Sequence, residues 1–87
     1  MLLKSLIEPM GPDDEFEIID AAGEFLPGCA GRMKNDSRHR EFFEPYLDRV
    51  VVAVTRLSGE FLKQVHCIEV GPAGAAEVEV KYEELTW

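Results

Sequence analysis

Four side chains of the types that bind zinc are the first candidates for chemistry in the chain. They are Cys29, His39, His66 and Cys67. A structural zinc site needs four such ligands converging on one ion. His66 and Cys67 are adjacent in a segment that we expect to form a β-strand, so their side chains leave opposite faces and cannot both reach one metal. The chain also lacks a Cys-x-x-Cys pair. We therefore predict no metal ion and no other cofactor, with Cys67 in the core and His66 half-exposed.

The sequence does not indicate a catalytic nucleophile. Asp36, Ser37 and His39 lie close together in the chain, but a catalytic triad is defined by geometry in the folded protein and not by adjacency. At the start of a helix such residues are typical of a cap and a solvated face. No glycine-rich loop has the Lys-Ser/Thr ending that holds phosphate, and no acidic run has EF-hand spacing. We therefore assign no catalytic residue and do not expect an enzyme.

A basic segment stands out against the acidic chain. Residues 32–40 contain four of the nine Lys and Arg residues and have a net charge of +3, whereas residues 1–31 and 41–87 have net charges of −6 and −5. A helix is predicted to begin here, and helix N-termini favour anions. One hypothesis is therefore an anion-binding protein or small enzyme that uses Arg32, Lys34, Arg38, His39 and Arg40. The alternative interpretation is that these bases neutralise the protein's own acids.

The overall composition excludes several classes of protein. The 87 residues include 17 Asp and Glu against 9 Lys and Arg, which gives a net charge of −8, and 46% are hydrophobic. This length predicts a single domain, residues 1–87, in which folding buries roughly 60–65% of the surface of the unfolded chain. The acidic balance argues against direct binding of nucleic acid or of an anionic membrane and favours basic partners.

The start of the chain and its cysteines indicate a cellular location. The first apolar segment is too short for a signal peptide and acids follow it at once. No run approaches the ~18 apolar residues of a membrane span. We therefore expect a cytoplasmic protein in which Cys29 and Cys67 are free thiols, because disulfides are rare in that compartment.

The clearest alternation of apolar and charged residues in the chain lies near its C-terminus. Apolar and charged residues alternate from Ala76 to Tyr82, which predicts a C-terminal strand with one dry face and one acidic face. The main hypothesis is a non-catalytic acidic interaction module that binds a basic protein partner through this face. Its contact residues would be Glu77, Glu79, Glu83 and Glu84. One form of such a module is an inhibitor that mimics nucleic acid, like the anti-CRISPR proteins of phages.

A third hypothesis is a structural or assembly subunit that forms a homodimer. Such a dimer would pair through an edge strand, or through an aromatic group of Phe42, Phe43 and Trp87.

The first half of the chain predicts short elements around one helix. Residues 2–7 are expected to form a strand that ends at Pro9. Residues 15–18 alternate and should form a strand, followed by a type I turn at residues 20–23 and a returning strand at 24–26. Residues 28–37 should form a loop. Asp36 or Ser37 caps a short helix near residues 37–46, which Pro45 ends or kinks near Glu44.

The second half of the chain predicts a hairpin. The β-branched residues 50–57 are typical of a buried strand, and a turn at Ser58-Gly59 leads to a returning strand over 61–70. Pairing Leu57 with Glu60 would put Val52 opposite Val65 and Val50 opposite Cys67. The predicted fold is therefore β-rich α+β: a single small domain of five to six mostly antiparallel strands, as a curled sheet or open barrel, with one short helix.

Overall fold

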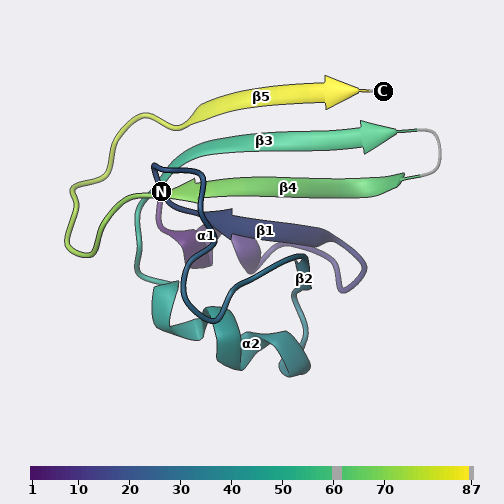
Figure 1. The fold of residues 1–87 in the computed structure, drawn as a ribbon, viewed down its shortest axis with the longest axis horizontal. Coiled ribbons are helices and arrows are strands. Elements are labelled where there is room, and N and C mark those ends of the chain that lie inside the picture. Colours follow the sequence, from purple (N-terminus) through teal and green to yellow (C-terminus); the bar gives the residue numbers. More distant parts are fainter. Residues whose placement is uncertain (60–61, 87) are drawn as a thin grey trace.

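The computed structural model describes residues 1–59 and 62–86. In chain order its elements are helix α1, strands β1 and β2, helix α2, the 3-10 helix η1, and strands β3, β4 and β5 (Figure 1). Their bounds are Leu3–Ile7, Glu15–Ile19, Met33–Lys34, Ser37–Phe43, Glu44–Tyr46, Val51–Gly59, Leu62–Val70 and Lys81–Thr86. The predicted fold of mostly sheet with a short helix is confirmed.

The strands form one mixed, open sheet in the order β2-β1-β4-β3-β5. β3 and β4 form an antiparallel hairpin, and the short β2 is antiparallel to β1. β1 is parallel to β4, and β5 is parallel to β3. The predicted antiparallel pairing is thus confirmed for the central hairpin. The parallel pairs are not predicted by the sequence pattern, because they depend on long connections that return the chain to the same end of the sheet.

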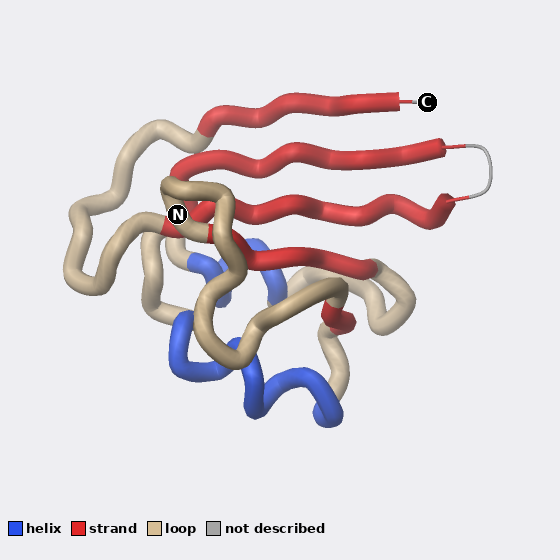
Figure 2. The backbone as a smooth tube through the Cα atoms, in the orientation of Figure 1, coloured by secondary structure: helices blue, strands red, loops and turns tan. Residues whose placement is uncertain are grey.

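The helices cover one face of the sheet near β1 and β2 and leave β5 without a helix beside it (Figure 2). Phe16 and Ile18 of β1 lie next to β4 on this face, where Ile18 is paired with Ile68. They pack against buried side chains of α1 and α2. The rings of Phe16 and Phe43 meet edge to face with their centroids 5.3 Å apart, which fixes the C-terminal end of α2 against β1.

The N-terminal segment is helix α1, so the predicted strand over residues 2–7 is wrong. Leu3 and Ile7 are buried, and their four-residue spacing puts both on one face of a helix. The amides of Leu3 and Lys4 donate to backbone carbonyls of residues 47–49, at 2.9 and 3.0 Å. These bonds satisfy amides that the first turn of a helix always leaves without an internal partner.

The turn after β1 is confirmed, whereas the returning strand is not. The Gly23 amide donates to the Asp20 carbonyl at 3.0 Å, and the Asp20 carboxylate accepts two further backbone N–H bonds. Residues 24–26 contribute only an isolated bridge between Ile19 and Phe25. On the edge of β1 that faces away from β4, the two-residue strand β2 pairs with Glu15 and Phe16, and β2 lies within the segment predicted to be loop.

Helix α2 and its boundaries agree with the prediction. Asp36 is the N-cap, and its carboxylate accepts a hydrogen bond from the His39 amide at 2.8 Å. The α-helix ends at Phe43, and Pro45 lies in the 3-10 helix that follows. A proline has no amide to donate to the α-helical ladder, which is why the α-helix stops there.

The β3–β4 hairpin has a different register from the predicted one. Leu57 pairs with Val65 and not with Glu60, and β3 continues through Gly59. The predicted turn at Ser58-Gly59 is therefore wrong, because pairing these residues in the ladder satisfies more backbone groups than turning there. Glu60 and Phe61, which the pattern places at the start of the returning strand, lie outside the described residues.

This register reverses the predicted burial of two residues. His66 faces the helices and is only 8% exposed, whereas Cys67 is half-buried on the opposite, open face. The expectation that their side chains leave opposite faces holds. The expectation of a core thiol at Cys67 and a half-exposed His66 is wrong.

The alternating segment before β5 is irregular. Residues 76–80 have no regular structure, and β5 begins only at Lys81. Lys81 pairs with Ala53, close to the beginning of β3, so the preceding residues have almost no strand beside them. Val78 is 52% exposed and Tyr82 is 64% exposed, so the predicted dry face is wrong. Val80 alone packs against the core.

Replacing Phe43 by Ala should lower the free energy of unfolding by about 3–5 kcal/mol, because the phenyl ring is fully buried. The neighbouring Phe42 is 44% exposed and is the matched control, for which Phe42→Ala should cost less than about 1 kcal/mol. Urea unfolding measures both values. Phe43→Leu gives a milder version if the alanine variant does not fold. Equal losses for Phe42→Ala and Phe43→Ala would contradict this packing.

Candidate functional site

Strand β5 is the most exposed element of the sheet. All six of its residues are exposed, and β3 is its one strand neighbour within the described chain. Its outer edge lies at the border of the molecule (Figure 1). Tyr82 and Leu85 are exposed by 64% and 42% and project from opposite faces because side chains alternate along a strand. The strand therefore offers backbone groups, apolar side chains and acids to a partner.

The four predicted contact glutamates do not form one strand face. Glu77 and Glu79 lie in the loop before β5, and Glu83 and Glu84 are on opposite faces of β5. Glu77 pairs with the amino group of Met1 at 2.7 Å. Glu84 pairs with Arg56 at 3.3 Å and stays 74% exposed. The acids therefore surround the β5 edge, and the predicted single acidic face is wrong.

Most of the basic segment is paired with the protein's own acids. Arg32 lies 3.8 and 3.6 Å from Glu15 and Glu17. The other two pairs are His39 with Asp36 at 2.8 Å and Arg40 with Glu44 at 4.0 Å. The backbone amide of His39 is the main reason why the Asp36 pKa is lowered, and the His39 ring adds to the effect. Lys34 and Arg38 have no ion pair among the described residues.

Two members of the basic segment line one pocket among the described residues. Arg32 and His39 line an open depression of about 310 Å³ between the loop 28–33 and α2. Arg32 is paired with Glu17 and the His39 ring is bonded to Asp36, so this depression presents little free positive charge.

The aromatic group of the homodimer hypothesis is not a surface in this structure. Phe43 is fully buried in the core, and Phe42 is 44% exposed. Trp87 lies outside the described residues.

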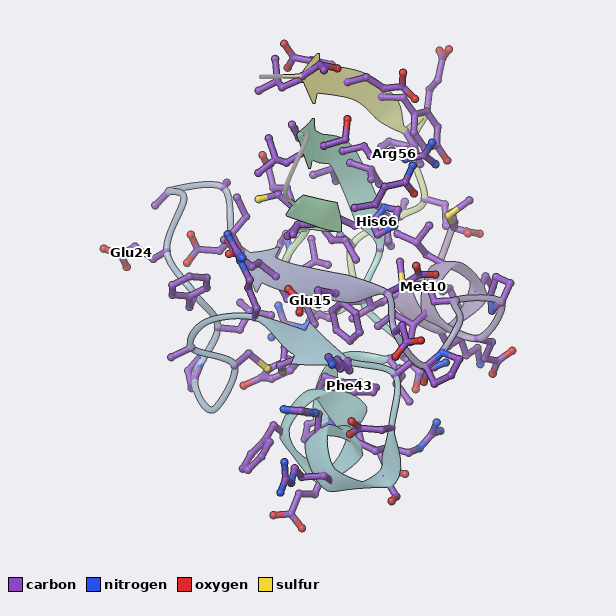
Figure 3. The ribbon with its side chains drawn as sticks, turned by 90° about the vertical axis from the view of Figure 1, so that its right-hand side faces the viewer. Met10, Glu15, Glu24, Phe43, Arg56 and His66 are labelled. Carbon is purple, nitrogen blue, oxygen red and sulfur yellow. The ribbon has the colours of Figure 1, made fainter. Side chains whose placement is uncertain are left out.

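The site that the sequence analysis missed is a small, partly enclosed pocket that we call the His66 pocket. It has a volume of about 100 Å³ and lies between α1 and strands β3, β4 and β5. Its lining residues are Leu6, Val54, Arg56, His66, Tyr82, Glu83 and Glu84. Arg56 and His66 are register partners and extend to the same side of the sheet (Figure 3). The sequence could reveal this site only through the correct pairing of β3 with β4, which sets Arg56 opposite His66.

The imidazole in this pocket is held in its neutral form. Burial is the main reason why the His66 pKa lies below its usual value, and the neighbouring Arg56 charge lowers it further, while Asp14 opposes the shift. No side-chain hydrogen bond joins the His66 imidazole to another described residue. Arg56 has Glu84 as its ion-pair partner, at 3.3 Å.

The remaining depressions and thiols offer less chemistry. An open depression of about 480 Å³ lies where β1 and β4 end, with Asp20 and Arg49 among its lining residues. Cys29 and Cys67 are free, as predicted. Burial raises the pKa of both thiols, and Glu17 and Glu69 raise that of Cys67 further. Protonated thiols are poor nucleophiles.

Two searches of the described residues and three comparisons with known proteins add no further site. No group of three or more His, Cys, Asp or Glu side chains comes together for a metal among them. None of their helices has the length and apolar character to cross a membrane. Comparison of the chain with protein-family models, curated proteins and solved structures gives no match.

Acid should destabilise this protein through His66. The folded-state pKa is depressed below the ordinary value of 6.5, so the unfolded chain takes up the proton more readily. The free energy of unfolding is therefore highest above pH 6.5 and falls as the pH drops toward the folded-state pKa. Urea unfolding between pH 7 and 5.5 should show this fall. His66→Gln should remove it and Arg56→Gln should weaken it; an unchanged slope in His66→Gln would show that another group is responsible.

Proposed function

We propose that this protein is a non-catalytic interaction module that binds an extended, basic segment of a partner protein along β5. The observation that carries the proposal is that β5 is exposed on both faces and has β3 as its one strand neighbour in the described chain. Unpaired backbone groups at a sheet edge bind an added strand, and pockets beside it select side chains.

The length and side chains of β5 support the binding of a protein partner at this edge. Edge strands are usually short or twisted away or covered, because an open edge pairs with other chains. β5 is a six-residue strand, and it exposes Tyr82 and Leu85 together with its charged residues. Aromatic and aliphatic side chains with a charged surround are typical of a protein contact.

The charge of the edge supports a basic partner. The chain has a net charge of −8, and the contact acids are Glu77, Glu79, Glu83 and Glu84. Glu79 and Glu83 have no ion pair among the described residues, so both are free to meet a cation. An acidic surface also speeds the approach of a basic partner.

Two finer forms of the proposal follow from the same features. A protein that binds basic surfaces with spaced carboxylates can inhibit a nucleic-acid-binding partner by taking the place of phosphates, as in the anti-CRISPR type of inhibitor. A cytoplasmic location agrees with the two free thiols.

The anion-binding alternative for residues 32–40 is weaker, because three of its five bases are already paired.

A peptide of alternating valine and lysine tests the proposal directly. It should perturb the backbone amide signals of β5 in NMR spectra, and its affinity, measured by fluorescence anisotropy, should fall as salt is raised. The double variant Glu79→Gln/Glu83→Gln should bind about fivefold more weakly, because each exposed ion pair contributes roughly 0.5 kcal/mol.

The control for that experiment removes the same charge elsewhere. Glu24 and Glu41 are exposed and lie in the turn after β1 and on α2, so Glu24→Gln/Glu41→Gln should leave the affinity nearly unchanged. A valine–glutamate peptide should not bind. Equal weakening by both double variants, or amide shifts that avoid β5, would refute the docking edge.

A further inference from the structure

Two basic side chains face each other across β3 and β4 beneath α1. Arg56 and His66 are directly opposite in the antiparallel register, and both line the His66 pocket. Groups that repel each other when charged destabilise a sheet when placed directly opposite. Glu84 on the edge strand β5 forms an ion pair with Arg56 at 3.3 Å. No described side chain forms a hydrogen bond with the His66 imidazole.

The unpaired imidazole is directed into the pocket. His66 is only 8% exposed, and a buried polar group without a partner is unfavourable. Yet among the described residues no fully buried side-chain nitrogen or oxygen lacks a partner. The ring nitrogens of His66 therefore keep some exposure, and His66 is one of the residues that line this pocket. A polar group kept in such a place is typical of a ligand contact.

The size and walls of the pocket limit the ligand. Its volume of about 100 Å³ is the space of roughly three water molecules, at ~30 Å³ each. Leu6 and Val54 form an apolar part of the lining, and Arg56 and His66 supply N–H donors. A guanidinium fork matches the two oxygens of a carboxylate.

We propose that the His66 pocket binds a small monocarboxylate, whose oxygens accept hydrogen bonds from Arg56 and His66 and whose short alkyl group packs against Leu6 and Val54. The Glu84 carboxylate occupies Arg56 in the free protein and must be displaced. Glu84 is 74% exposed, and such exposed ion pairs are weak, so the exchange is feasible. This site shares Tyr82, Glu83 and Glu84 with the docking edge, but it needs no protein partner and is tested without one.

The two histidines of the chain provide an internal test. Acetate and propionate are added at constant ionic strength, with sodium chloride as the reference salt, and the ring carbon-bound protons of His39 and His66 are followed by NMR. The His66 signals should shift saturably with either carboxylate and its pKa should rise in the complex. The His39 signals should not saturate, because His39 lies outside this pocket and is bonded to Asp36.

Three variants separate the parts of the site. Arg56→Gln should abolish the saturable His66 shift, and Glu84→Gln should bind acetate severalfold more tightly because the competing carboxylate is gone. Arg38→Gln is the matched control on α2 and should bind as the parent does. The gain in Glu84→Gln distinguishes a ligand site from a structural role, since a structural role predicts no tighter binding.

Several results would overturn the proposal. They are a His66 signal that does not saturate, His39 and His66 signals that move together, and Glu84→Gln binding no better than the parent. Inorganic phosphate is the second probe: saturation with phosphate and not with acetate would make the site a phosphate site and the carboxylate assignment wrong. None of these results depends on whether β5 binds a basic peptide.

Discussion

The alternation of side chains along β4 is the constraint on which the rest of the structure depends. β4 is hydrogen-bonded to β1 on one side and β3 on the other, so its pleat sets which residues of three strands face the helices. Ile68 and Val70 must be buried to complete the core. His66 lies at the same two-residue period and therefore on the same face, where it is 8% exposed.

The His66 side chain has no hydrogen-bonded partner among the described side chains, so its packing neighbours and nearby charges determine its state. α1 contributes Leu6 beside the ring but does not seal the pocket, and the neighbouring Arg56 keeps the imidazole neutral by lowering its pKa further. On the opposite face the same pleat leaves Cys67 beside Glu17 and Glu69, whose charges keep the thiol protonated. β4 therefore places its titratable groups on two different faces of the sheet, and the partly enclosed His66 pocket lies on the helix side.

Features that depend on neighbouring residues could be predicted from the sequence, whereas pairing between distant segments could not. The Asp36 cap, the end of α2 before Pro45 and the alternation of β1 are local, and all three are confirmed. The hairpin register was wrong because Ser58-Gly59 is a good turn sequence that the longer ladder overrides. The His66 pocket was missed for the same reason, since one error in register exchanges the two faces of a strand.

The edge at β5 could also pair with the same edge of a second copy of the chain. An antiparallel contact between two copies centred on β5 would set Glu83 of one copy opposite Glu84 of the other, and like charges in that position are unfavourable. Lys81 is the one base in the strand and would lie diagonal to Glu84 of the other copy, where it offsets part of this repulsion. The same two glutamates that oppose a second copy would favour a cationic segment, so under the proposed function the charge of the edge selects between the two kinds of partner.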